Sequence, residues 1–106
     1  MNATEFLKLS EAFLIDLADY IEDNDAESEF DVEYSDGILN INVFEQSKQY
    51  VINKHSASSK IWFSSPVSGA NYFAYDEAKK QWLDDDKKEL KNILISELKN
   101  NFNFKK

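Results

Sequence analysis

Ten carboxylates crowd one short stretch of this 106-residue chain, with no lysine or arginine between them: Asp16, Asp19, Glu22, Asp23, Asp25, Glu27, Glu29, Asp31, Glu33 and Asp36. Two unit charges about 4 Å apart in water repel each other by roughly 1 kcal/mol, so this crowding costs stability. Carboxylate oxygens are ligands that hard cations prefer, and dense negative charge attracts basic protein surfaces. The window therefore indicates either a cation site or a docking surface for a basic partner.

The motifs of tight metal sites are absent from the sequence. It contains no D-x-[DN]-x-[DN]-G calcium loop and no H-E-x-x-H zinc motif, and the only histidine, His55, lies far from the acidic window. An open row of monodentate carboxylates should bind cations weakly, at several overlapping sites, and discriminate poorly among Fe(II), Fe(III), Mn(II) and Co(II). The alternative interpretation is a solvated face that maintains solubility.

No other group of residues predicts a catalytic centre. The acids at 84–86 are placed to cap a helix N-terminus. Ser64 and Ser65 lack a nearby histidine and acid, and two glycines cannot build a phosphate-binding loop. Without cysteine there is no disulfide and no thiolate metal site. We therefore expect no catalytic residue and no organic cofactor.

Two amphipathic helices are predicted at the ends of the chain. The first has its apolar stripe at Phe6, Leu9, Phe13, Leu14, Leu17, Tyr20 and Ile21. Thr4 is its expected N-cap, and Asp16, Asp19 and Asp23 gather on one flank of its polar face. The second helix has apolar residues at Leu90, Ile93, Leu94, Leu98 and Phe102, and Asp86 with Glu89 has the spacing of a capping box at its start.

Short strands are predicted between the helices, at residues 30–34, 38–44, 49–53, 60–64, 71–75 and 81–83. Asp36-Gly37 predicts a tight hairpin turn. Adjacent strands without crossover helices form an antiparallel sheet, and two amphipathic helices can cover one of its faces. We expect an α+β fold: a two-layer α/β sandwich with both helices on one face of an antiparallel sheet of about five to six strands. Residues 1–106 are expected to form one domain.

Trp62 is a candidate for an exposed contact residue. Ile61 and Phe63 share one face of their strand, so Trp62 points to the open face of the sheet if they point to the helices. With Asn53 and Lys60 beside it, an exposed tryptophan would suit a protein interface. The alternative is a core position for Trp62, as we expect for Trp82.

Charge is polarised along the chain. The first 45 residues hold 13 acids and one lysine, whereas the other 61 hold 7 acids and 11 lysines. Hydrophobic residues make up 42% and aromatic residues 14%, which is typical of a folded protein and not of an acidic disordered one. No apolar run approaches about 20 residues, and no basic or Arg-rich targeting segment begins the chain. We expect a soluble intracellular protein that does not bind membranes.

Two stretches resemble a known family. Tyr50-Val51-Ile52-Asn53-Lys54-His55, followed by the stretch from Lys60-Ile61-Trp62-Phe63 through Ser68-Gly69, is similar to the signature of the frataxin family. The acidic first helix fits as well, and the likeness covers nearly the whole chain. The chain is most similar to the bacterial, CyaY-type members.

This resemblance implies a non-enzymatic protein that regulates iron–sulfur cluster assembly and serves as an iron donor. Iron, as Fe²⁺ or Fe³⁺, would bind weakly and reversibly, with other divalent cations able to substitute. The implied iron ligands are Asp19, Glu22, Asp23, Asp25, Glu27, Glu29, Asp31 and Glu33. The implied partners are a cysteine desulfurase, docked through the acidic residues, and an iron–sulfur scaffold protein. The implied partner-binding residues on the sheet are Asn53, Lys60 and Trp62. A monomer in the bacterial cytoplasm that binds no nucleic acid is expected.

The chain departs from the family pattern beside Trp62. Lys60 replaces the usual glutamine, while Ala70, Tyr72 and Ala74 replace a proline, a basic residue or histidine, and an aspartate. Two alternative functions stay open: a ferroxidase or iron-storage activity, or an acidic interaction module with no metal role.

Overall fold

Ten elements make up the computed structural model, which describes residues 1–104 apart from the side chain of Glu45. The helices are α1 (Ala3–Asp23) and α2 (Leu90–Asn101), with short 3₁₀ turns η1 (Phe44–Gln46) and η2 (Ser56–Ser58). The strands are β1 (Phe30–Ser35), β2 (Ile38–Val43), β3 (Lys48–His55), β4 (Lys60–Ser65), β5 (Gly69–Asp76) and β6 (Gln81–Leu83). Neither helix in the described part is long and apolar enough to span a membrane.

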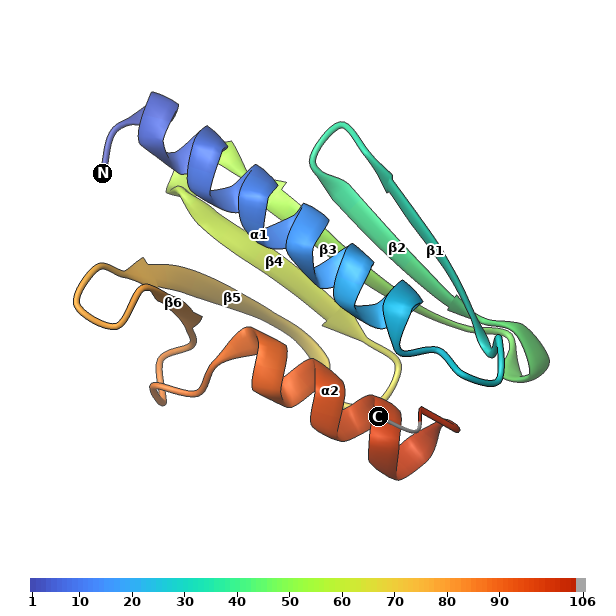
Figure 1. Ribbon diagram of the computed structural model, residues 1–106. Helices are drawn as coiled ribbons and strands as arrows, with labels where there is room; N and C mark the ends of the chain where they lie inside the picture. The colour runs from blue at the N-terminus through green and yellow to red at the C-terminus, as the bar shows by residue number, and fades with distance from the viewer. Residues whose placement is uncertain (105–106) are drawn as a thin grey trace.

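The six strands form one antiparallel sheet in which each strand pairs with its neighbours in the sequence, from β1 at one edge to β6 at the other. Both helices pack on the same face of this sheet, and the other face is left open (Figure 1). The predicted two-layer sandwich is confirmed, with six strands.

Hydrophobic periodicity explains the packing. Alternate strand residues such as Leu39, Ile41 and Ile52 are fully buried under the helices. The helices bury one stripe each, consisting of Phe6, Leu14, Leu17 and Ile21 in α1 and Leu90, Leu94 and Leu98 in α2. Trp82 is buried among them, as predicted. Burying one such large side chain contributes about 1.5–3 kcal/mol, so these two stripes hold the helices on the sheet.

The first hairpin fixes which residues face the helices. Asp36 and Gly37 both have positive φ, 49° and 77°, which is the geometry of a two-residue type I′ turn. The turn places Ser35 opposite Ile38 and, further along, Glu33 opposite Asn40. The predicted turn is therefore present, and its register sends the β1 carboxylates to the open face of the sheet.

Both predicted helix starts are wrong in detail. Asn2, not Thr4, is the N-cap of α1, because its Oδ1 accepts a hydrogen bond from the Glu5 backbone N–H at 2.8 Å. Asp86 and Glu89 form no capping box, since Glu89 is the N-cap of α2 and makes no side-chain hydrogen bond there. Asp84 instead accepts backbone N–H groups of Asp86 and Lys88, both at 2.9 Å, and so stabilises the loop before the helix.

A network around Glu97 connects α2 to the sheet and to the β4–β5 loop. The Glu97 carboxylate accepts hydrogen bonds from the hydroxyls of Tyr50 at 3.0 Å, Ser65 at 2.5 Å and Ser68 at 2.6 Å. The Ser65 hydroxyl in turn accepts the backbone N–H groups of Val67 and Ser68. Burial raises the pKa of Tyr50 well above its ordinary value, and the negative charge of Glu97 adds to this effect. Sequence patterns gave no sign of this network.

Replacing Glu97 with alanine should lower the free energy of unfolding by about 2 kcal/mol, because the buried Tyr50 hydroxyl loses its acceptor. Urea unfolding followed by far-UV circular dichroism measures the loss. Lys99→Ala, on the exposed side of the same helix, is the matched control and should change stability little. Adding Tyr50→Phe to Glu97→Ala should cost less than the sum of the two single changes, whereas strict additivity would contradict the proposed contact.

Candidate metal-binding and partner-binding surfaces

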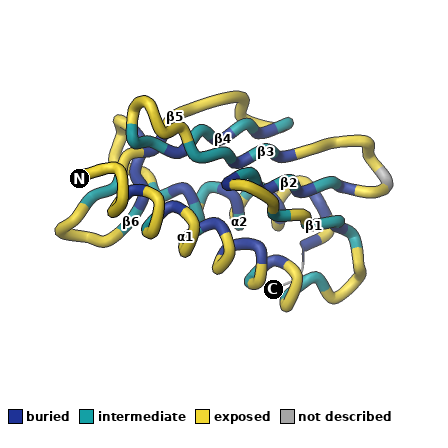
Figure 2. The backbone as a smooth tube through the Cα atoms, turned by 90° about the horizontal axis from the view of Figure 1, so that it is seen from above, coloured by how far each residue is buried: buried dark blue, intermediate teal, exposed yellow. Residues whose placement is uncertain are grey.

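The acids of α1 are exposed on the side of the helix that faces away from the sheet (Figure 2). Asp16, Asp19, Glu22 and Asp23 occupy this side because the core-facing stripe takes the remaining positions of the turn. None of these four carboxylates forms an ion pair with a lysine of residues 1–104. Within residues 1–104, these four carboxylates thus face solvent without a paired cation.

Asp25, a predicted iron ligand, has a structural role in the loop after α1. Its Oδ1 accepts the Glu29 backbone N–H at 2.8 Å and its Oδ2 accepts that of Phe30 at 3.0 Å. The half-buried carboxylate thus holds the loop against the start of β1. Each oxygen has a second lone pair, so Asp25 can still attract a cation while it supports the backbone.

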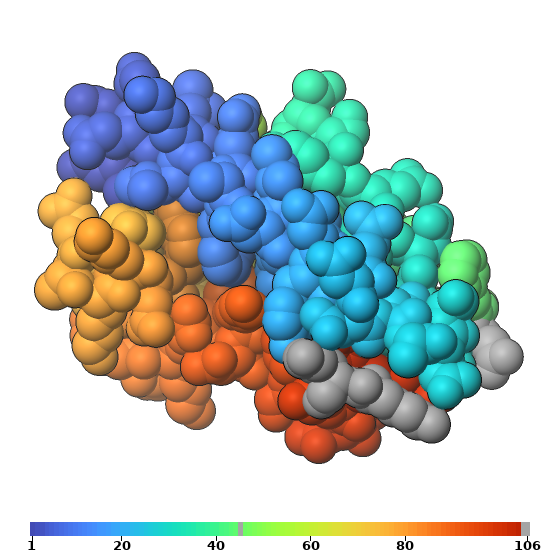
Figure 3. Space-filling view, viewed as in Figure 1, coloured from blue at the N-terminus to red at the C-terminus, as the bar shows by residue number. Residues whose placement is uncertain are grey.

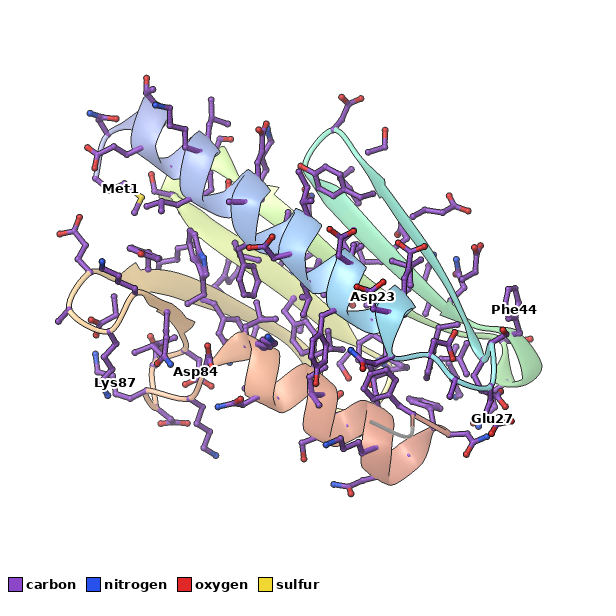
Figure 4. The ribbon with its side chains drawn as sticks, in the orientation of Figure 1. Met1, Asp23, Glu27, Phe44, Asp84 and Lys87 are labelled. Carbon is purple, nitrogen blue, oxygen red and sulfur yellow. The ribbon has the colours of Figure 1, made fainter. Side chains whose placement is uncertain are left out.

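Glu27 and Glu29 continue the acidic surface along this loop. Glu27 is exposed, and Glu29 is half-buried, with its Oε1 accepting a hydrogen bond from the Asn103 side chain at 3.1 Å. The Glu29 carbonyl accepts the Phe44 backbone N–H at 3.1 Å, which brings the η1 turn beside the loop. Phe44 is 61% exposed at this corner of the molecule, where Figure 4 shows it near Glu27.

Asp31 and Glu33 lie on the opposite side of the sheet from α1. They pair with Asn42 and Asn40 of β2, whereas Phe30 and Val32 alternate with them toward the helices. The eight predicted iron ligands therefore follow the rim of the sandwich, from the helix layer, around edge strand β1, to the open face. We call these eight residues the acidic edge. Figure 3 shows its helix and loop portions as one continuous surface.

The acidic edge offers no preformed cage for a metal ion. Within the described part of the chain, no three or more acid or histidine side chains are grouped closely enough to hold one. A cation on the acidic edge would therefore have one or two carboxylate ligands and keep most of its water. Such a site binds weakly and exchanges readily.

The open face of the sheet brings the predicted partner residues together. Asn53, Trp62 and Tyr72 are paired in register across β3, β4 and β5, and Lys60 is two residues from Trp62 on the same strand and face. Trp62 is half-buried, whereas Ile61 and Phe63 are buried under the helices. Trp62 therefore lies on the open face, as predicted, and the alternative core position is wrong. We call Asn53, Lys60, Trp62 and Tyr72 the sheet patch.

Tyr72 was not among the predicted partner residues, although it extends the row. It is 44% exposed, and the His55 ring packs edge-on against it with 5.5 Å between centroids. The strand pattern could have identified Tyr72. It alternates with the buried Phe73 as Trp62 alternates with Ile61 and Phe63, so both residues are expected on the open face.

Comparison with known proteins identifies the family. The family model of the frataxin-like domain matches residues 1–104, so this chain belongs to the frataxin family. A relative is the mitochondrial frataxin of Dictyostelium discoideum, 44% identical over 70 residues that cover 65% of this chain and 36% of that protein. The chain thus spans about a third of that relative's length.

Two solved structures share the fold. The frataxin of Psychromonas ingrahamii, from the CyaY protein family, matches with a TM-score of 0.80 and 20% identity, over 95% of this chain and 92% of its own. A trimeric frataxin from the yeast Saccharomyces cerevisiae, in complex with ferrous iron, matches with a TM-score of 0.74 and 27% identity, over 90% of this chain and 86% of its own. The predicted family is confirmed, while the bacterial CyaY type stays a prediction.

Replacing Asp25 with alanine should destabilise the fold by about 1–2 kcal/mol, because two backbone N–H groups lose their acceptor. Asp23→Ala, two residues earlier and exposed, removes the same charge without removing a side-chain hydrogen bond within residues 1–104, and it should leave the melting temperature unchanged or slightly higher. Thermal unfolding of both variants at one ionic strength measures the difference. Equal melting temperatures would show that Asp25 is only one more surface charge.

Proposed function

We propose that this protein binds iron along the acidic edge and regulates iron–sulfur cluster assembly, docking onto a cysteine desulfurase and acting as an iron donor. Membership of the frataxin family supports this role, as does the ferrous iron in the yeast frataxin structure. The observation that carries the proposal is the row of exposed α1 carboxylates that no lysine of residues 1–104 neutralises. Crowded anions without internal counter-charges suit an external cation.

Weak binding fits the transfer of iron. A carboxylate on a helix surface contributes one or two oxygens, so an iron ion at Asp19, Glu22 or Asp23 would keep coordinated water. A partner with more or softer ligands could then replace the carboxylates, since affinity follows ligand number and type. The protein would raise the local concentration of cations without binding any of them tightly.

Docking onto the desulfurase would use the same charge. A negative rim steers a basic partner surface toward it and orients the encounter, and salt weakens this attraction. The acidic edge reaches the open face through Asp31 and Glu33, so a desulfurase bound there would lie beside the sheet patch. The scaffold protein would contact the sheet patch, where Trp62 provides an aromatic anchor and Asn53 a hydrogen-bonding amide.

Neutralising Asp19, Glu22 and Asp23 together, as Asn, Gln and Asn, should remove most iron binding and weaken desulfurase capture at least tenfold, because these exposed charges carry both attractions. Asp25 is left intact to preserve the loop. The control neutralises three exposed acids elsewhere, Glu5, Glu77 and Asp86, and so has the same net charge.

Two measurements test this variant pair: paramagnetic broadening of amide signals by Fe(II), and pull-down of purified desulfurase at two salt concentrations. The control should behave like the unmodified protein in both. If variant and control capture the desulfurase equally, the acidic edge is not its docking surface. If Fe(II) broadens the α1 amides of the variant as before, Asp19, Glu22 and Asp23 are not the iron ligands.

Replacing Trp62 with alanine should weaken scaffold binding by 2 kcal/mol or more, about thirtyfold in Kd, because buried tryptophans dominate interface energies. Phe44→Ala is the matched control, since Phe44 is an exposed aromatic outside the sheet patch. Isothermal titration of the purified scaffold into each variant measures the effect. An equal loss in both variants, or none in Trp62→Ala, would contradict a role for the sheet patch.

A further inference from the structure

A cleft of about 200 Å³ adjoins the sheet patch at the β5–β6 end of the sheet. Ala74 lies in it, paired with Lys60 on one side and Leu83 on the other, and its methyl group leaves space that a larger side chain would fill. The exposed Tyr72 forms one wall. This volume suits one side chain of a partner and is below the usual size of a small-molecule site.

Three carboxylates line this cleft, and two of them, Asp76 and Asp84, use only one oxygen for hydrogen bonds within residues 1–104. Asp84 is only 9% exposed, and both of its hydrogen bonds, from the Asp86 and Lys88 backbones, go to Oδ1. Asp76 likewise uses Oδ1, for the Lys79 backbone N–H at 3.0 Å. No hydrogen bond or ion pair within residues 1–104 reaches either Oδ2. Fully buried polar atoms without partners are absent from the described residues, so both free oxygens face accessible space.

Within residues 1–104, no lysine forms an ion pair with Asp76 or Asp84. Lys60 and Lys87 also line the cleft, yet neither forms an ion pair with Asp76 or Asp84. Figure 4 shows Asp84 and Lys87 in the loop before α2, at the far end of that helix from Glu27. The cleft is therefore separate from the acidic edge, and it retains acceptor oxygens next to an aromatic wall.

We propose that this cleft receives an arginine side chain of the protein that docks on the sheet patch. A guanidinium group is planar, stacks on an aromatic ring such as that of Tyr72, and donates hydrogen bonds to carboxylates such as Asp84. A hydrated metal ion fits less well, because it would not stack on the Tyr72 ring that forms one wall of the cleft. This inference rests on the proposed function, since it names a contact of the same docked partner.

The direct test titrates the protein with N-acetylarginine amide and, separately, with its neutral isostere N-acetylcitrulline amide, followed by ¹H–¹⁵N NMR. The arginine probe should cause saturable shifts at Ala74, Leu83 and Asp85, and the citrulline probe should not. Asp84→Asn should weaken the response roughly tenfold, while Asp86→Asn, which removes an exposed acid outside the cleft, should not. Equal responses to both probes, or strongest shifts along the acidic edge, would overturn the proposal.

A second test fills the cleft and measures scaffold binding. Ala74→Leu should weaken binding roughly tenfold, and Ala70→Leu, on the same strand and face, should have a smaller effect. If Trp62→Ala weakens binding and Ala74→Leu does not, the cleft proposal fails while the sheet patch stands. If neither variant weakens binding, the proposed use of the sheet patch fails.

Discussion

The sheet has one covered and one open face, and this difference determines where the candidate functional residues of the strands lie. The two helices pack against the apolar residues of each strand. The residues that alternate with them therefore face outward. The type I′ turn at Asp36-Gly37 fixes this alternation at the start of the sheet, and antiparallel pairing transmits it from β1 to β6. Trp62, Tyr72 and Glu33 lie on the same face for this reason, although they are far apart in the sequence. A one-residue shift in register would send Trp62 into the core and Ile61 to solvent.

The charges of the acidic edge repel one another, and the same charges would attract the cation of the proposed function. Its members are spread over a helix, a loop and an edge strand, and water screens most of them, so the repulsion costs less than the sequence spacing suggests. Asp25 offsets part of the cost by holding two backbone N–H groups. The exposed helix acids have no such compensation within residues 1–104. This division separates acids that support the fold from acids that are available to a ligand.

Hydrophobic periodicity predicted the two helices, the six strands and the layered architecture, because burial of apolar stripes decides these features locally. It also placed Trp62 on the open face and Trp82 in the core. Hydrophobic periodicity did not predict individual hydrogen bonds, because these depend on the local conformation of the backbone. Asn2 caps α1 in place of Thr4. Asp84 accepts backbone N–H groups in the loop before α2, whereas Asp86 and Glu89 were expected to form a capping box at the start of that helix. The contacts of Glu97 with Tyr50 and Ser65 join residues distant in the sequence, so no spacing rule could reveal them.

Strand β1 has only one neighbour in the sheet. Apart from the Phe30 N–H, which Asp25 binds, its outer backbone groups have no strand partner among the described residues. Such a border strand can recruit further strands and start an aggregate. Asp31 and Glu33 oppose this, because two copies of β1 brought side by side would place like charges together. The carboxylates suited to cations thus also keep copies of the protein apart. If iron binds these carboxylates as proposed, it removes this protection, and the tendency to aggregate would then rise with metal concentration.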